Sequence, residues 1–135
     1  MTTVELIDDS HCFVCGKDNP AGLKIEWKTR DNVTEAQFTL FKAYQGWKDV
    51  VHGGILATVL DEAMTRLAWQ KFGGAVTAEM TVRYLKPARV GDRLSVRGEV
   101  DDIKGRLIPA RAEIRDSAGD IVAEATGKAL KAKGQ

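Results

Sequence analysis

The amino-acid sequence predicts an α+β fold in which a curved antiparallel sheet of about six strands wraps around one long helix. Apolar and polar residues alternate with period two through most of the chain, which is typical of strands with one buried face. A single segment, residues 55–72, has helical spacing instead. The strand segments are joined by short turns, which favours antiparallel neighbours. One helix must then cover the apolar face of the sheet.

The predicted strands lie on both sides of the helix. Before it, alternation runs over residues 23–28 and 35–40, and Asp31-Asn32 between them predicts a hairpin turn. After it, turns are expected at residues 101–105 and 117–119. These turns separate four further predicted strands, at residues 76–84, 94–100, 108–114 and 121–129.

The helical segment runs from Ile55 to about Phe72. Its apolar residues fill an arc of roughly 180° at about 100° per residue, which is wider than a surface stripe. We therefore expect the sheet to embrace this helix, and Gly73-Gly74 to end it. The apolar positions are Ile55, Leu56, Val59, Leu60, Ala63, Met64 and Leu67.

Length and composition limit the class of protein. With 135 residues the chain predicts one domain, with an N-terminal extension and turn over residues 1–21 and a core over residues 22–131. A net charge of +1 argues against a nucleic-acid partner. No apolar stretch approaches the roughly 20 residues of a membrane span, and the first ten residues lack the pattern of a signal peptide. We expect a soluble, cytoplasmic protein.

The segment His52-Gly53-Gly54 stands where the helix is predicted to start. The first N–H groups of a helix have no partner inside it and carry the positive end of its dipole. Two glycines there let a carbonyl or oxyanion approach the backbone without meeting a Cβ atom. The segment predicts either an oxyanion-binding site or a tight turn into the helix.

Two acidic residues, Asp61 and Glu62, follow two turns later. Glu62 stands four residues before Arg66, which predicts an ion pair on the helix surface. Asp61 has no basic residue three or four positions ahead, and aspartate is a poor residue for a helix interior. Asp61 is therefore either a functional carboxylate or an ordinary exposed aspartate.

The run His52-Gly53-Gly54, followed by Leu60-Asp61, resembles the signature of the hot-dog-fold acyl-CoA thioesterases. The similarity is to the phenylacetyl-CoA thioesterase type of the 4-hydroxybenzoyl-CoA thioesterase superfamily. The segments Tyr84 to Ala88 and Val90-Gly91-Asp92 resemble the next strand and turn of that family. The resemblance covers roughly residues 22–131.

This resemblance implies that the chain hydrolyses an acyl-CoA thioester at a site shared by two subunits. Gly53 N–H of one subunit would polarise the thioester carbonyl, and Asp61 of the other would act as general base or nucleophile. His52 would orient the loop or the thioester, and Thr77 would stand near the attacking water. The expected assembly is a homodimer, with two dimers forming a tetramer, and coenzyme A enters only as part of the substrate, without a cofactor.

The expected substrate-binding residues lie around this motif. Many relatives carry an amide or an acid where this chain has Gly46, so Gln45 beside it is a candidate to replace that group. Gly54 and Trp47 are expected to line the carbonyl and acyl sites. Three cations near a strand end are candidates for the coenzyme A phosphates: Arg83, Lys86 and Arg89.

The remaining motif is His11-Cys12-Phe13-Val14-Cys15-Gly16. One C-x-x-C pair supplies two of the four ligands that a structural zinc site needs, so we expect turn and packing chemistry and no metal. Two other functions stay open from the sequence. One is a non-catalytic acyl-CoA-binding protein, and the other is an enoyl-CoA hydratase or dehydratase of the same superfamily. The sequence leaves the acyl specificity open.

Overall fold

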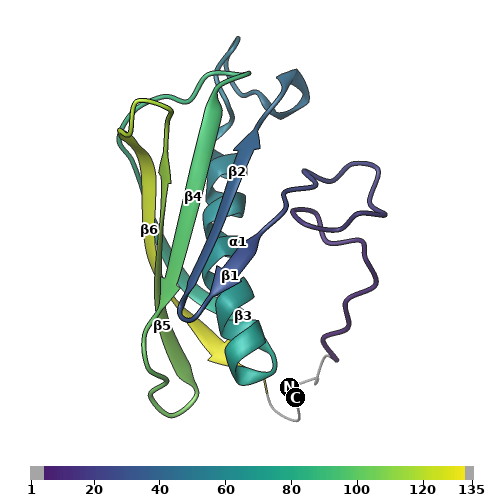
Figure 1. Cartoon of the computed structure of the whole chain (residues 1–135), viewed down its shortest axis with the longest axis vertical. Coiled ribbons are helices and arrows are strands. Elements are labelled where there is room, and N and C mark those ends of the chain that lie inside the picture. Colours follow the sequence, from purple (N-terminus) through teal and green to yellow (C-terminus); the bar gives the residue numbers. More distant parts are fainter. Residues whose placement is uncertain (1–4, 133–135) are drawn as a thin grey trace.

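A computed structural model describes residues 5–132 (Figure 1). Residues 1–4 and 133–135, which belong to the predicted single domain, lie outside the described part. The elements follow in the predicted order of two strands, a long helix and four strands. They are β1 (Lys28–Arg30), β2 (Val33–Thr39), the short 3-10 helix η1 (Lys42–Tyr44), α1 (Gly53–Phe72), β3 (Ala75–Tyr84), β4 (Arg93–Val100), β5 (Leu107–Arg115) and β6 (Ile121–Lys131).

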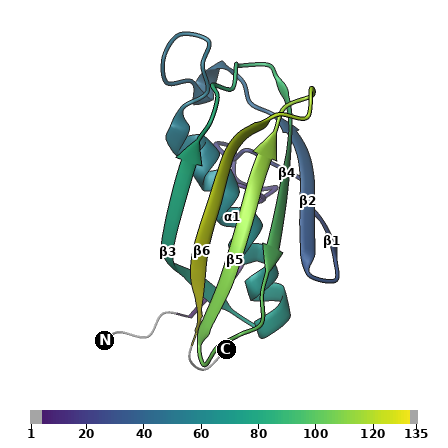
Figure 2. The ribbon, with the colours of Figure 1, turned by 90° about the vertical axis from the view of Figure 1, so that its left-hand side faces the viewer.

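The strands form one six-stranded sheet in the order β1-β2-β4-β5-β6-β3. Every neighbouring pair is antiparallel. The sheet curves around α1, and β1 and β3 form its two edges (Figure 2). The predicted architecture is therefore confirmed. Because β3 pairs with β6 alone among the described strands, its outer edge carries unpaired backbone groups.

Helix α1 buries the apolar arc predicted for it except Ile55, which is half-buried, and Gly73 ends the helix in the left-handed conformation (φ 77°). The helix approaches β4 so closely that a Cβ atom on Gly98 would lie 2.3 Å from the carbonyl oxygen of Ala63. Glycine at this strand position therefore fixes how near the helix lies to the sheet. No helix among residues 5–132 combines the length and apolar character needed to cross a membrane.

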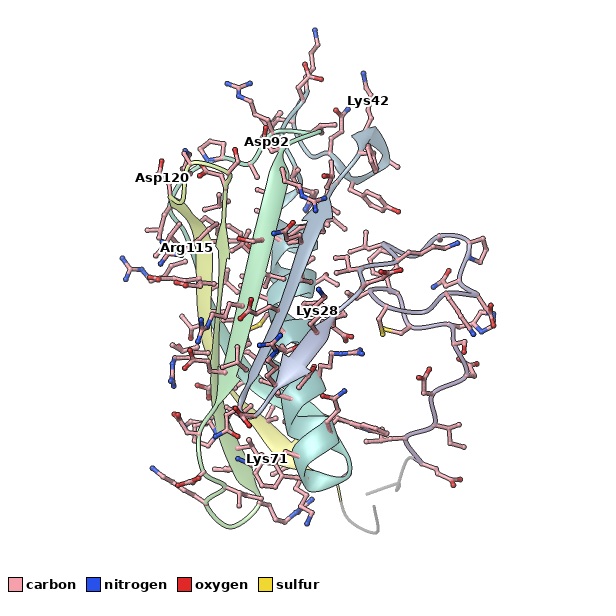
Figure 3. All side chains as sticks on the ribbon, viewed as in Figure 1. Lys28, Lys42, Lys71, Asp92, Arg115 and Asp120 are labelled. Atoms are coloured by element: carbon pink, nitrogen blue, oxygen red, sulfur yellow. The ribbon has the colours of Figure 1, made fainter. Side chains whose placement is uncertain are left out.

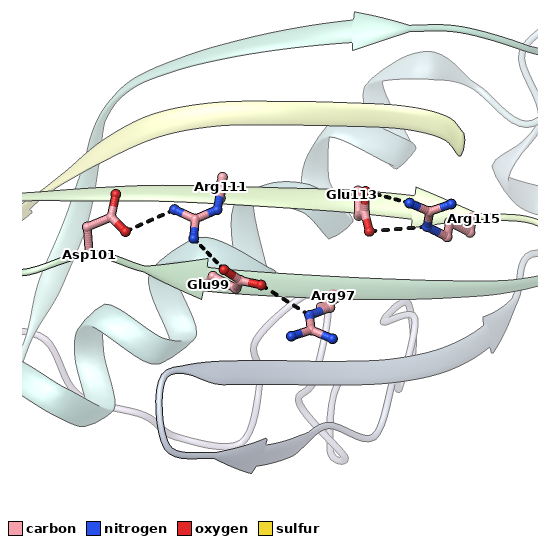
Figure 4. A network of polar contacts seen from close by, with 6 residues as sticks. All are labelled: Arg97, Glu99, Asp101, Arg111, Glu113 and Arg115. Atoms are coloured by element: carbon pink, nitrogen blue, oxygen red, sulfur yellow. Dashed lines mark hydrogen bonds and ion pairs between the residues drawn. The ribbon is translucent and has the colours of Figure 1, made fainter. Parts of the chain in front are cut away.

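The outer face of the sheet, away from α1, is charged. Arg111 of β5 pairs with Glu99 of β4 and, at 2.9 Å, with Asp101. Arg97 lies 3.2 Å from Glu99, and these side chains form a ladder across two strands (Figure 4). Alternating signs on neighbouring strands are favourable cross-strand pairs. This face is suited to water or to a polar partner.

The first strand differs from its prediction. Residues 23–27 are irregular, and β1 begins only at Lys28. The alternation there reflects other contacts, because Leu23 N–H and Ile25 N–H donate to the carbonyls of Phe13 and Val14 at 2.8 and 2.9 Å. The N-terminal segment, residues 5–27, thus lies against α1 on the side away from the sheet (Figures 1 and 2).

The apolar residues of β3 are incompletely covered. Val76 and Tyr84 are 45% and 53% exposed, and Met80 and Val82 are half-buried. The equivalent residues of the central strands β4 and β5 are buried, because α1 and the neighbouring strands cover them. An edge strand with an exposed apolar face and free backbone groups is a surface on which a second chain can pair.

Candidate active site

The start of α1 is built by His52, which caps the helix. Its backbone is extended (φ −62°, ψ 130°), and its Nδ1 accepts a 2.9 Å hydrogen bond from Gly54 N–H. A Cβ atom on Gly54 would lie 3.1 Å from that nitrogen, so the cap favours glycine there. The tight turn foreseen as one alternative for this motif is therefore present.

The next residue, Gly53, presents the polar group that can act on a substrate. Its carbonyl accepts a 2.8 Å hydrogen bond from the hydroxyl of Tyr84, whose ring would lie 3.3 Å from a Cβ atom on Gly53. No acceptor among residues 5–132 takes the Gly53 N–H. An uncommitted N–H at a helix N-terminus is suited to a carbonyl or oxyanion. The sequence offered no signal for the contact of Tyr84.

The loop before the helix explains the glycine at position 46. A Cβ atom on Gly46 would lie 3.3 Å from the Cα atom of His52, so the loop packs backbone against backbone here. The Gln45 side chain accepts a 3.1 Å hydrogen bond from Asp49 N–H and so stabilises the loop. Trp47 at the tip is 85% exposed.

The side chain of Asp61 is half-buried where α1 faces β3. The hydroxyl of Thr77, on β3, donates a hydrogen bond to Asp61 Oδ1. No cation among the described residues forms an ion pair with Asp61, whereas Glu62 Oε2 lies 3.6 Å from Arg66 Nη1, as predicted. The structure thus brings together two of the predicted catalytic residues, Asp61 and Thr77.

Gly53 and Asp61 are not brought together within one chain. They stand eight residues apart on one helix, which separates them by about 12 Å along its axis. A carbonyl that is about 3 Å from the Gly53 N–H is therefore beyond the reach of Asp61 of the same chain. Three cavities of 370, 750 and 610 Å³ lie elsewhere on the molecule, and neither residue lines any of them.

The three candidate phosphate-binding cations have different surroundings. Lys86 Nζ lies 2.6 Å from a carboxylate oxygen of Asp116 and 3.3 Å from one of Asp120. Asp120 lies at the same end of the sheet as Asp92 (Figure 3). Its hydrogen bond to Asp116 raises the pKa of Lys86 and lowers the pKa of that carboxyl. Arg83 lies 3.5 Å from Glu124.

Arg89 is the least committed of these cations. Its backbone N–H donates to Asp92 at 2.9 Å, while its side chain has no acceptor among residues 5–132. The backbone of Val50 pairs with that of Arg89, which places this cation beside the loop that leads into α1. Arg89 is therefore the cation best placed to meet an anionic group near that loop.

The cysteine motif forms the expected turn, in which Gly16 N–H donates to the carbonyl of Cys12 at 2.9 Å. The structure adds a contact that the sequence did not indicate. Cys12 Sγ lies 3.9 Å from Glu62 Oε1, so the turn meets α1 on the flank opposite Asp61. The two residues are 50 positions apart, and no local pattern links them.

Comparison with known proteins identifies the family. The model of the thioesterase superfamily matches residues 48–123, more than half of the chain. An acyl-coenzyme A thioesterase from Xenopus laevis is 31% identical over 88 residues, which are 64% of this chain and 40% of that protein. The chain thus spans less than half the length of that relative.

Solved structures share the fold. A thioesterase superfamily protein superposes with a TM-score of 0.85 at 24% identity, covering 97% of this chain and 69% of its own. The Escherichia coli PaaI protein, from the phenylacetic acid degradation operon, gives 0.74 at 23% identity, over 81% and 84% of the two chains.

A hypothetical thioesterase protein from Streptococcus pneumoniae, solved with coenzyme A, gives a TM-score of 0.73 at 24% identity, over 79% and 84% of the two chains. Two mutant structures of that protein have also been solved. In one an aspartate is replaced by alanine, and in the other a threonine sixteen positions further along the chain is replaced by alanine. With its family match and its single helix inside a six-stranded antiparallel sheet, this chain belongs to the thioesterase superfamily and has the hot-dog fold.

Proposed function

We propose that this chain hydrolyses acyl-CoA thioesters to a free acid and coenzyme A, without a cofactor, at a site formed by two copies of the chain. Membership of the thioesterase superfamily supports the reaction class. The activity named for the Xenopus relative and the coenzyme A bound to the Streptococcus protein support the substrate class. The acyl group is left open, because the acyl pocket would be lined by both copies.

The observation that carries the proposal is the hydrogen bond from Thr77 to Asp61. It holds a half-buried carboxylate that has no cation partner among the described residues. Such a carboxylate keeps its capacity to accept a proton or to attack a carbonyl carbon. The aspartate and the threonine replaced in the Streptococcus protein have the same separation in sequence as Asp61 and Thr77.

The proposed reaction uses one donor and one carboxylate. Gly53 N–H donates to the thioester carbonyl oxygen and stabilises the negative charge that develops there. Asp61 of the second copy takes a proton from water while the water oxygen bonds to the carbonyl carbon. The C–S bond then breaks, its electron pair leaves with sulfur, and the proton passes from Asp61 to the thiolate. Direct attack by Asp61, followed by hydrolysis of the anhydride, would use the same two residues.

The geometry of β3 indicates how two copies would complete the site. Tyr84, at the end of β3, contacts Gly53, and Thr77, near its start, contacts Asp61. An antiparallel pairing of two β3 edges, centred between Met80 and Thr81, sets Thr77 of each copy opposite Tyr84 of the other. Asp61 of one copy would then approach Gly53 of the other. The same pairing would satisfy the free backbone groups along the outer edge of β3.

A further pairing of two dimers into a tetramer is part of the proposal. The charged ladder on the outer face of the sheet offers a polar surface with both signs of charge for such a contact. Pairing through that face would leave the proposed active sites, at the β3 edge, open to substrate.

The reaction is tested by thiol release from a panel of aromatic, short and long acyl-CoA thioesters. Asp61→Asn removes the base with little change in shape, and we expect kcat to fall on the order of 10²–10⁴-fold. Thermal unfolding serves as the control for folding. An Asp61→Asn variant with wild-type turnover across the panel would refute the assignment. Tight acyl-CoA binding by the wild type without thiol release would instead favour a binding protein, and enoyl-CoA hydration without thiol release a hydratase.

The shared site is tested by mixing two inactive variants. Gly53→Pro removes the N–H at the first helical position, where proline is well tolerated. When Gly53→Pro and Asp61→Asn chains exchange subunits, a mixed dimer holds one intact site. Random exchange should therefore restore roughly a quarter of the wild-type rate, since half of the dimers are mixed. Sedimentation checks the assembly, and a mixture that stays inactive after demonstrated exchange would rule out the shared site.

A further inference from the structure

Three groups able to bind a metal meet where the N-terminal segment contacts α1. The sulfur atoms of Cys12 and Cys15 and a carboxylate oxygen of Glu62 all lie within 4.8 Å of one another. Both cysteines are free thiols and half-buried. Glu62 points from α1 toward the cysteine turn, whereas Asp61 points toward Thr77 of β3. The cluster is therefore separate from the proposed active site. Two sulfurs and a carboxylate form a donor set that suits Zn²⁺.

The turn that carries the cysteines is shaped around the first sulfur. Val14 N–H and Cys15 N–H donate to Cys12 Sγ at 3.4 and 3.5 Å. Two N–H donors stabilise a thiolate more than a thiol, because the thiolate is the charged acceptor. Gly16 permits this turn, since a Cβ atom there would lie 2.4 Å from the Cys12 nitrogen. Two backbone donors therefore fix the position of the Cys12 sulfur in this turn.

The Glu62 carboxylate lies between a cation of its own helix and the cysteine turn. Glu62 Oε2 faces Arg66 at 3.6 Å, while Oε1 faces Cys12 Sγ at 3.9 Å. A divalent cation at the centre would bind the two sulfurs as thiolates and release their protons. Arg66 would then orient the carboxylate from the other side.

We propose that Cys12, Cys15 and Glu62 bind a Zn²⁺ ion that fastens the N-terminal segment to α1. A fourth ligand completes a tetrahedral site, and water can supply it, since all three residues line the 610 Å³ cavity between the segment and the helix. The sequence alone predicts no metal because it supplies only the two cysteines. The third ligand, Glu62, lies on α1, 50 positions after Cys12 in the sequence.

The site is tested on the reduced full-length protein with Co²⁺ and Zn²⁺ as probes. Co²⁺ bound by thiolates gives a sulfur-to-metal charge-transfer band, and a tetrahedral ion gives strong d–d bands in visible light. We expect one Co²⁺ per chain with both features, displaced by one equivalent of Zn²⁺. Zn²⁺ should also raise the melting temperature, because all three ligands meet only in the folded state.

Variants separate the three ligands from other groups. Cys12→Ser, Cys15→Ser and Glu62→Gln should each weaken Zn²⁺ binding by at least about 100-fold, more than the loss of an outer hydrogen-bond partner does. His11→Ala, in the same segment and outside the cluster, is the matched control and should bind as the wild type does. Thioesterase turnover should persist in Cys15→Ser, which distinguishes this site from the proposed active site.

Any of four outcomes would overturn the proposal. The first is a reduced wild-type protein that gives no charge-transfer band with excess Co²⁺. The second is Zn²⁺ affinity unchanged in Cys15→Ser, with circular dichroism showing that the variant is folded. The third is a loss of affinity in His11→Ala as large as that in Cys12→Ser. Equal reactivity of both thiols toward a disulfide reagent with and without Zn²⁺ would also exclude the site.

Discussion

The hydroxyl of Tyr84, the last residue of β3, donates a 2.8 Å hydrogen bond to the carbonyl of Gly53, the first residue of α1. This bond ties the start of the helix to the edge of the sheet. It occupies the carbonyl of Gly53 and leaves the N–H on the opposite side of the residue available. Tyr84 therefore positions the proposed oxyanion donor.

Tyr84→Phe should lower kcat/KM by about 2- to 10-fold, since one hydrogen bond of this kind contributes about 1 kcal/mol. The loss should appear in kcat, because the polarising group is displaced while the surfaces for coenzyme A are intact. Tyr44→Phe is the matched control, since the Tyr44 hydroxyl contacts backbone carbonyls of the N-terminal segment at 3.3 and 3.4 Å. Equal effects of the two substitutions would exclude a positioning role.

Gly53→Pro and Gly53→Ala together test the backbone donor. Both add a Cβ atom against the ring of Tyr84, but only proline removes the N–H. We expect Gly53→Pro to lower kcat by 10²–10³-fold relative to Gly53→Ala, the usual loss for one oxyanion donor. Steady-state kinetics on one acyl-CoA measure the ratio. A ratio near one would show that another group polarises the carbonyl.

Gly98→Ala tests the close packing of α1 on β4. The added methyl group would lie 2.3 Å from a backbone oxygen, which no side-chain rotation can relieve. The substitution should lower the free energy of unfolding by about 1–3 kcal/mol or more, measured by urea denaturation. Ser95→Ala, in the same strand, should stay within about 0.5 kcal/mol of the wild type. Similar stabilities for the two variants would contradict the close contact.

Cys15 predicts an alkaline limit to stability in the metal-free, reduced protein. Its pKa is raised from 9.0 to about 12, chiefly by burial. A raised pKa means that this thiol favours folding below pH 9 and that the advantage is lost as pH rises toward about 12. The free energy of unfolding of the wild type should therefore fall relative to Cys15→Ala over this range, in urea titrations with a chelator present. Parallel curves would contradict the raised pKa.

The sequence predicted those parts of the structure that depend on local patterns. Helix α1, the turn at Asp31-Asn32 and the Glu62–Arg66 pair follow from residues close together in the chain, and all three are present. The same logic failed for residues 23–27, where alternation reflects long-range contacts instead of a strand. The placement of β3 at the sheet edge depends on strand order, which no local pattern encodes.

The same distinction between local patterns and tertiary contacts applies to the residues of the candidate site. The helix start at Gly53 was foreseen from its glycines, and the meeting of Asp61 with Thr77 from a family resemblance. The contact of Tyr84 with Gly53 was missed because it joins residues 31 positions apart through the tertiary structure. The contact between Cys12 and Glu62 was missed for the same reason.

Asp61 and Glu62 are consecutive residues of one rigid helix, yet they face different neighbours, Thr77 on one flank and the cysteine turn on the other. The backbone of an α-helix cannot rotate or shift at one residue and stay fixed at the next. A shift of the helix backbone at Glu62 would therefore also move the backbone of Asp61. The N-terminal segment, which contacts Glu62 through Cys12, therefore packs against the helix that carries Asp61.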